Sequence, residues 1–200
     1  MLVRILIYIK HNVPIIWQLI EWLNASFFQL FHANRFNKVV PFVLKEFVLN
    51  GYTFRQLKLI DLSLLQKLIC KQTPSRLDFF NPHGFSENAL LKTFRNPSFL
   101  MMGVFAEQQL IGYFFLRCFW NRKCFVGRLI DESYEGKGIG RVMNSIMYQI
   151  GWRSGFRVLS TISKNNHMVV KSHANNPNMI VLKELNNDFL YIEFLENKKF

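Results

Sequence analysis

The segment from position 131 to 143 has the residue types of an anion-binding loop. It reads Asp-Glu-Ser-Tyr-Glu-Gly-Lys-Gly-Ile-Gly-Arg-Val-Met, with glycine at every second position from 136 to 140. Glycine lacks a Cβ, so the backbone can turn tightly and a ligand can approach it closely. A helical pattern follows directly, which places the loop amides at a helix N-terminus, where the helix dipole also attracts anions. Such a loop can bind a diphosphate. The residues expected to hold it are Gly136, Lys137, Gly138, Ile139, Gly140 and Arg141.

Two common nucleotide-binding loops do not fit this segment. A dinucleotide fingerprint needs G-x-G-x-x-G and an acidic residue about 20 positions further on. Here the third glycine position is Met143, and the acidic position is Ser160. A P-loop needs G-x-x-x-x-G-K followed by Ser or Thr, and no such segment occurs.

The same segment resembles motif A of the GNAT family, the acyl-CoA-dependent N-acetyltransferases. The family pattern is Q/R-x-x-G-x-G/A, and Glu135 takes the Gln/Arg place before the three glycines. Further on, Asn166 begins an N-x-x-x-x-x-x-Y pattern typical of the family's next helix, with His173 in place of the Tyr. The resemblance covers roughly residues 50–195, about three-quarters of the chain.

The resemblance implies an α/β fold with a mixed, mostly antiparallel central sheet. One strand pair of that sheet splays apart, and helices cover both faces. It also implies acetyl-CoA as co-substrate, no metal, and direct attack of an acceptor amine on the thioester. The strand before the loop would receive the pantetheine arm along Leu129, Ile130 and Asp131. The amide of Ile130 or Asp131 would then polarise the thioester carbonyl.

The proton transfers are assigned by the same resemblance. His173 stands where the family has the acid that protonates the thiolate, and imidazolium can take that role near neutral pH. Asp131 and Glu132 end the strand near the incoming amine, so either could accept its proton through a water. Asn166 either contacts the pantetheine or only caps a helix. Glu135 departs from the family, because a carboxylate repels a diphosphate unless it points away or pairs with Arg141.

The acceptor is expected to be an amine near the loop Phe-Phe-Asn-Pro-His-Gly-Phe at 79–85. His83 and Phe85 are its candidate substrate-binding residues, and His83 is an alternative base. This loop loosely resembles GNAT proteins of amino-sugar and surface-polysaccharide biosynthesis, which favours an amino sugar or its nucleotide-linked form. Two alternatives stay open. One is a catalytically weak acyl-CoA-binding module, and the other is an acetyltransferase acting on protein or aminoacyl-tRNA amines.

Composition limits the class of protein. The chain has 200 residues, half of them hydrophobic, with 21 Phe, which is ample for a core and excludes intrinsic disorder. The net charge of +12 attracts anions in general. No basic-aromatic motif of a nucleic-acid reader is present, so nucleic acid is not expected as a partner. Cys70, Cys118 and Cys124 fit no metal spacing and are expected as reduced thiols in the cytoplasm.

Residues 1–45 differ from the rest and are expected to form a hydrophobic, mostly helical extension of an acyltransferase domain at 46–200. A helical pattern spans 13–31, with a narrow polar stripe on one side. No uncharged apolar run reaches the roughly 18 residues that span a bilayer, and no signal-peptide cleavage site is evident. Three interpretations remain open: a helical pair packed on the domain, a homodimer interface, or a peripheral anchor at the inner face of the membrane.

The remaining chain alternates between strand and helix patterns in the order β-α-α-β-β-β-α-β-α-β-β. The expected strands are 52–59, 99–106, 110–119, 123–131, 156–163, 179–185 and 189–195, and the expected helices are 61–70, 86–94, 140–155 and 166–174.

Overall fold

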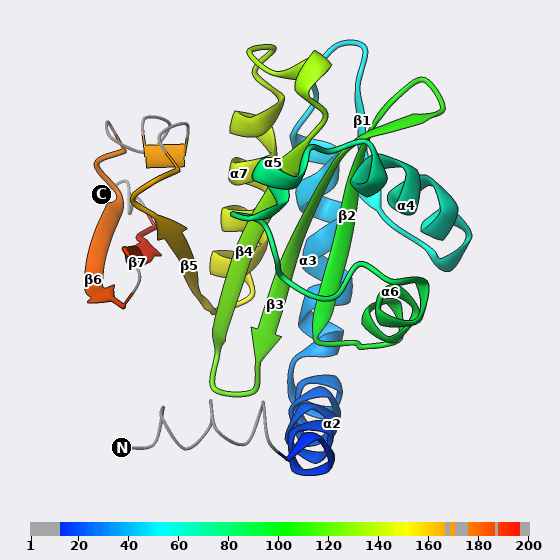
Figure 1. Cartoon of the computed structure of the whole chain (residues 1–200). Coiled ribbons are helices and arrows are strands. Elements are labelled where there is room, and N and C mark those ends of the chain that lie inside the picture. Colours follow the sequence, from blue (N-terminus) through cyan, green and yellow to red (C-terminus); the bar gives the residue numbers. More distant parts are fainter. Residues whose placement is uncertain (1–12, 167–168, 171–175, 187, 197–200) are drawn as a thin grey trace.

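The computed structural model describes residues 13–166, 169–170, 176–186 and 188–196. Seven strands form one sheet in the order β1-β2-β3-β4-β5-β7-β6, antiparallel throughout except for β4 and β5 (Figure 1). The α/β class and the mostly antiparallel sheet are therefore confirmed. The strands are β1 Thr53–Gln56, β2 Phe99–Ala106, β3 Gln109–Phe119, β4 Lys123–Ile130, β5 Arg157–Ser163, β6 Met179–Leu185 and β7 Phe189–Phe194.

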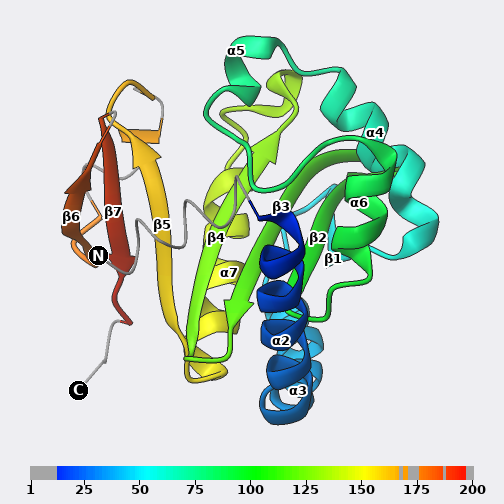
Figure 2. The ribbon, with the colours of Figure 1, turned by 60° about the horizontal axis from the view of Figure 1, so that its bottom comes forward.

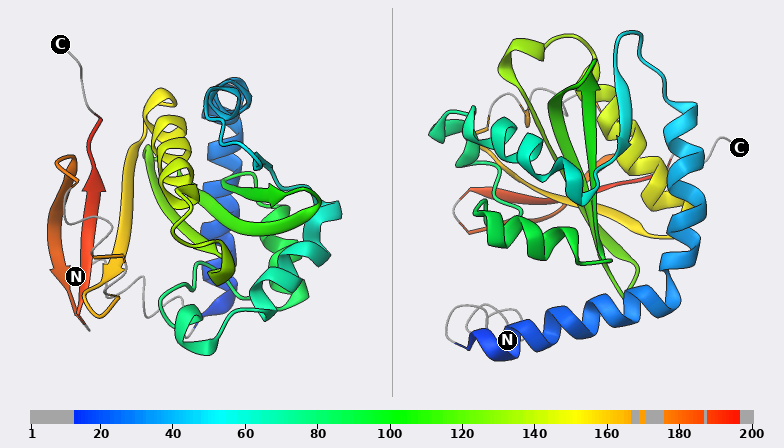
Figure 3. Two further views of the ribbon diagram at one scale, coloured as in Figure 1. Left: turned by 90° about the horizontal axis from the view of Figure 1, so that it is seen from above. Right: turned by 90° about the vertical axis from the view of Figure 1, so that its right-hand side faces the viewer.

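Helices cover both faces of the sheet (Figure 3). The alternation of side chains along a strand explains this, because successive residues point to opposite faces. In β2, Leu100 and Met102 join the cluster formed with α3 and α7, whereas Phe99 and Met101 join the cluster formed with α4 and α6. The helices are α2 Pro14–Phe31, α3 Ala33–Glu46, α4 Leu62–Cys70, α5 Pro74–Leu77, α6 Glu87–Phe94 and α7 Ile139–Arg153, with short 3-10 turns η1 Leu59–Asp61 and η2 Glu132–Tyr134.

The one parallel strand pair, β4 and β5, separates along its length. The two strands pair only from Lys123–Phe125 to Arg157–Leu159. The Ser160 hydroxyl then donates to the Val126 carbonyl at 3.0 Å. On its other edge β5 pairs with β7 from Val158 to Ser163, and beyond the last β4 contact a wedge opens between β4 and β5 (Figure 2). The splayed pair expected from the resemblance is thus present, and its open end faces the glycine loop.

Several expected elements differ in extent. The strand expected over 52–59 is only Thr53–Gln56, because a 3-10 turn begins at Leu59. A short helix, α5, occupies Pro74–Leu77, where proline favours a helix start. The helix expected over 166–174 lies largely outside the described residues.

Helix α2 is anchored to the sheet by the buried side chain of Asn24. Its Nδ2 donates to the Ser98 hydroxyl at 3.1 Å and to the Cys118 carbonyl at 3.0 Å, and its Oδ1 accepts from the Trp120 amide at 3.1 Å. Phe28, 1% exposed, packs on rings of α3 and of the α7–β5 turn. The opposite side of α2 carries exposed apolar side chains, including Leu19, Trp22 and Leu30. Within the described residues, no helix is long and apolar enough to cross a membrane.

Two of the cysteines lie directly opposite each other. Cys118 of β3 pairs in register with Cys124 of β4, as the hairpin expected around residue 121 requires. Both thiols are buried and neither is bridged. Burial raises the pKa of the Cys118 thiol well above its usual value, so it stays protonated as a small apolar core group.

Candidate functional site

The glycine loop lies between the open end of β4 and the start of α7. Gly136 has φ +73° and Gly138 has φ +79°, left-handed conformations that side chains rarely adopt. Gly138 is the N-cap of α7, and its carbonyl accepts from the Arg141 amide at 3.1 Å and the Val142 amide at 3.3 Å. The glycines thus allow the chain to leave η2 and enter α7 within four residues.

The amides from Gly136 to Gly140 belong to the loop for which the sequence predicts anion binding. No hydrogen bond among the described residues accounts for these five donors, whereas the Arg141 amide is already used by the Gly138 carbonyl. An alanine Cβ at Gly136 or Gly138 would meet nothing within 4 Å, so the loop backbone is open to a ligand. Lys137 holds its Nζ 4.5 Å from the centre of the Tyr134 ring and adds positive charge nearby. The loop therefore presents unpaired donors at the positive end of a helix.

Glu135 is neutralised by Arg76 rather than by Arg141. The Arg76 Nη2 donates to Glu135 Oε1 at 2.6 Å and to the Ile130 carbonyl at 2.8 Å, and its Nε donates to Gln72 Oε1 at 3.1 Å. This ion pair turns the carboxylate toward α5 and offsets the charge that would repel a diphosphate.

Asp131 is buried at the end of β4 and its carboxylate is fully engaged. It accepts from Lys71 Nζ at 2.6 Å, from the Ser133 amide at 3.1 Å and from the Ser133 hydroxyl at 2.6 Å. Although burial alone raises its pKa, these donors together lower the pKa of Asp131 below its usual value. The carboxylate thus caps η2 and is a weak proton acceptor, whereas neighbouring Glu132 is exposed.

Replacing Asp131 by asparagine is expected to lower the free energy of unfolding by about 1 kcal/mol. The loss stays small because Lys71, left without its partner, is 55% exposed and can be hydrated. Urea denaturation of the variant and of Lys71→Met measures this. A loss of activity with unchanged stability would instead give Asp131 a direct role in proton transfer.

The edge of β4 that faces the wedge is set by its pairing with β3. The Asp131 amide donates to the Ile111 carbonyl at 2.8 Å, so Asp131 directs its backbone groups toward β3. Because these groups alternate along an antiparallel strand, those of Ile130 and Arg128 face the wedge. Of the two amides considered for the thioester carbonyl, that of Ile130 is therefore the one on the open edge, and Leu129 directs its backbone groups toward β3.

A cavity of about 100 Å³ occupies the wedge. Arg128, Asn144, Tyr148 and Asn166 contribute polar side chains to it, and Phe80 covers one end. The Asn166 Oδ1 accepts from the Val169 amide at 3.2 Å, as a helix cap does, while the residue also lines the cavity. His173, the candidate acid, lies outside the described residues.

His83 and Phe85 belong to the loop at 79–85, whose first residues, Phe79 and Phe80, line the wedge cavity. The Gly84 carbonyl can only accept, so His83 Nδ1 carries the proton at 2.9 Å, and Nε2 accepts from the Tyr113 hydroxyl at 2.8 Å. Burial lowers the pKa of His83, and the Arg117 charge lowers it further. Phe85 stacks on Phe80 with ring centres 6.5 Å apart. Both ring nitrogens of His83 are thus engaged within the fold.

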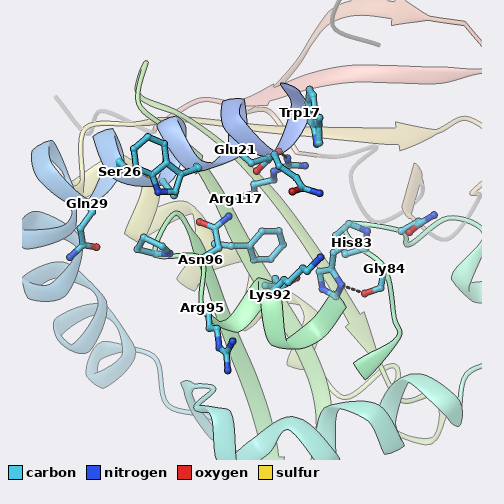
Figure 4. A pocket seen from close by; sticks show the side chains of 18 residues that line it. Trp17, Glu21, Ser26, Gln29, His83, Gly84, Lys92, Arg95, Asn96 and Arg117 are labelled. Carbon is cyan, nitrogen blue, oxygen red and sulfur yellow. Dashed lines mark hydrogen bonds and ion pairs between the residues drawn. The ribbon is translucent and has the colours of Figure 1, made fainter. Parts of the chain in front are cut away.

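A larger cavity of about 870 Å³ lies between this loop and α2 (Figure 4). His83 and Gly84 border it on one side and Trp17 on the other. Lys92 and Arg95 add cations, and Arg117 pairs there with Glu21. The loop at 79–84 thus separates this cavity from the one in the wedge.

The neutral state of His83 predicts an acid-sensitive stability. The folded form disfavours protonation of His83, so around the ordinary imidazole pKa of 6.5 the unfolded chain binds more protons. Stability therefore falls as the pH drops below 6.5 toward the lower pKa of His83 in the folded form. His83→Gln is expected to make this decline shallower, and so is Tyr113→Phe, which removes the donor to Nε2. Thermal unfolding as a function of pH measures both, and slopes equal to that of the unmodified chain would contradict the assignment.

The residues missed by sequence reasoning are those that reach the site from distant elements. Lys71 directly follows α4 and Arg76 lies in α5, about 60 positions before their partners. Arg128 and Asn144 come from β4 and α7. No spacing pattern links them. Among the described residues, no group of three or more His, Cys, Asp or Glu side chains could hold a metal ion.

Solved structures share the fold of this chain, although no family model and no curated protein matches the sequence. The PaiA N-acetyltransferase of Thermoplasma acidophilum, in complex with coenzyme A, is 17% identical with a TM-score of 0.62, over 72% of this chain and 99% of that one. The GNAT domain of S. lividans PAT is 11% identical with a TM-score of 0.61, over 70% of this chain and 88% of that one. The spermidine N-acetyltransferase of Vibrio cholerae, in complex with CoA and spermine, is 16% identical with a TM-score of 0.57, over 72% of this chain and 94% of that one. The chain therefore has the fold of GNAT acetyltransferases.

Proposed function

We propose that the protein is an acyl-CoA-dependent N-acetyltransferase, in which an acceptor amine directly attacks the thioester of acetyl-CoA. The observation that carries this proposal is the row of unpaired amides from Gly136 to Gly140 at the mouth of the β4–β5 wedge. A diphosphate at a helix N-terminus satisfies such donors and gains from the dipole. Neighbours with the same fold bind coenzyme A, which supports this ligand.

The two substrates would meet in the wedge. The loop, with Lys137, Ile139 and Arg141, holds the diphosphate, and the pantetheine follows the open edge of β4. The Ile130 amide polarises the thioester carbonyl, a contribution of a few kcal/mol at most. Alignment of amine and carbonyl supplies much of the remaining rate.

In the proposed proton transfers, Glu132 is the better acceptor for the amine proton. Its carboxylate is exposed, whereas the three donors to Asp131 lower the pKa of that group. His173 is proposed as the acid that protonates the departing thiolate, and Asn166 as a contact of the pantetheine.

An amino sugar, or its nucleotide-linked form, is proposed as the acceptor. The cavity of about 870 Å³ bordered by His83 has room for such a ligand, and Lys92 and Arg95 suit a diphosphate. Phe85 lies behind His83 on the same loop and would shape this site. Spermidine N-acetyltransferase shares the fold, so a small amine acceptor fits it as well.

Residues 46–200 are proposed as the acyltransferase domain and residues 1–45 as an extension that contacts the cytoplasmic face of a membrane. Exposed Trp22, Leu19 and Leu30 on α2 support an apolar contact. Liposome co-sedimentation of the full chain and of Trp22→Ser tests this. Equal partitioning of both would exclude the membrane contact and leave homodimerisation as the alternative for the exposed side of α2.

Two measurements test the proposed activity. Calorimetry with coenzyme A is expected to show one site per chain, and thiol release from acetyl-CoA is expected with amino sugars or their nucleotides. Absence of coenzyme A binding would overturn the proposal. Turnover confined to peptide amines or charged tRNA would replace the acceptor, and binding without turnover on any amine would favour an acyl-CoA-binding module.

A further inference from the structure

Arg128 places a cation inside the β4–β5 wedge. Its Nε donates to Asn144 Oδ1 at 2.9 Å, and its guanidinium lies against the first turn of α7. A Cβ on Gly140 would lie 2.8 Å from Arg128 Nη1 and 3.0 Å from its Cζ. The third glycine of the loop therefore serves a different purpose from the first two: it leaves room for this side chain.

The charge of Arg128 has no counter-ion among the described residues. Five other arginines form ion pairs with carboxylates, but Arg128 forms none with a described side chain. Among the described residues that line its cavity there is no Asp or Glu, and Glu135, whose charge raises the pKa of Arg128, is already bound by Arg76. Burial consequently lowers the pKa of Arg128. A desolvated cation without a partner destabilises the folded state, so it is expected to serve an anionic ligand.

The cavity beside Arg128 lies where the two proposed substrates meet. The residue belongs to the open edge of β4, two positions before Ile130. Phe79 and Phe80 of the acceptor-side loop line the same cavity, as do residues 160–163 of β5. Its volume of about 100 Å³ corresponds to roughly three waters, enough for a carboxylate and its adjacent carbons.

From these observations we infer that the guanidinium of Arg128 binds a carboxylate carried by one of the two substrates. This inference rests on the proposed function and refines its substrate class. The carboxylate belongs either to a dicarboxylic acyl group on coenzyme A or to the amine acceptor. Nη1 and Nη2 form no hydrogen bond with a described side chain, so the planar group can donate two parallel hydrogen bonds to one carboxylate.

Matched ligand pairs distinguish a carboxylate on the acyl group from a carboxylate on the amine acceptor. Succinyl-CoA and butyryl-CoA have the same chain length but end in a carboxylate or a methyl group. For the acceptor, titrations in the presence of coenzyme A compare glucosaminuronic acid with glucosamine, and L-alanine with L-alaninamide. We expect the carboxylated member of the acyl pair or of an acceptor pair to bind at least about tenfold more tightly.

Variants assign that preference to Arg128. Arg128→Gln is expected to abolish it and Arg128→Lys to retain part of it, because lysine keeps the charge without the two-pronged geometry. Lys38→Gln, at an exposed position of α3, removes the same charge elsewhere and should leave the preference unchanged. Thermal unfolding checks that each variant folds, and Arg128→Gln should be no less stable than the unmodified chain.

The possible failures are distinguishable. If coenzyme A itself does not bind, the proposed function fails and this inference with it. If coenzyme A binds but no pair shows a carboxylate preference, or the preference survives in Arg128→Gln, this inference alone is overturned.

Discussion

Replacing Gly136 and Gly138 together by alanine is expected to weaken coenzyme A binding about 100-fold, or about 2.7 kcal/mol. Both residues have positive φ, where an L side chain costs roughly 1–2 kcal/mol per residue. The chain would relieve this strain by rotating the peptides that aim the free amides outward. Each new Cβ would also project into the open space from which a diphosphate approaches. Calorimetric titration with coenzyme A measures the loss.

The chain provides a matched control for this substitution. Gly51 and Gly155 have φ of +82° and +78°, and both lie outside the loop. Gly51→Ala/Gly155→Ala should therefore reduce stability by a similar amount while leaving coenzyme A affinity within about threefold. If both double variants lose affinity equally, the effect reflects general destabilisation and the loop is not the binding site.

Arg76→Gln is expected to weaken coenzyme A binding about tenfold, or about 1.4 kcal/mol, without touching the loop itself. The substitution frees the Glu135 carboxylate one residue before the unpaired amides and removes the donor to the Ile130 carbonyl. An unpaired negative charge beside the diphosphate site repels the ligand. The effect should shrink at high salt, because the pair is partly exposed.

A double-mutant cycle tests the cause of that loss. Glu135→Gln alone should bind coenzyme A at least as tightly as the unmodified chain. Arg76→Gln/Glu135→Gln should recover most of the lost affinity, since no carboxylate then needs neutralising. A double variant as weak as Arg76→Gln would show that Arg76 acts on the ligand directly or through the Ile130 carbonyl.

Local features of the site were predictable because they depend on neighbouring residues. The glycine spacing predicts a tight turn, and the helical pattern directly after it predicts a helix from about Gly140, one residue after the observed start of α7 at Ile139. The facing of Cys118 and Cys124 likewise follows from a short hairpin. These elements require only the stereochemistry of a few adjacent residues.

The electrostatics of the site could not be predicted in this way. The sequence left Asp131 as a candidate base, but the Lys71 and Ser133 donors lower its pKa. It suggested Arg141 as the partner of Glu135, but the fold brings Arg76 there. A pKa depends on burial and on charges within a few ångströms, and both are fixed only after distant segments pack.

The amino-acid sequence by itself determined the glycine loop before a helix, the alternation of strands and helices, and the α/β class, because glycine conformations and side-chain periodicity act over a few residues. Tertiary structure alone decided where β4 and β5 separate, that Arg76 binds Glu135, and that Arg128 lies in the wedge without a counter-ion among the described residues. Those facts arise from contacts between residues 16 to 59 positions apart, which no local pattern records.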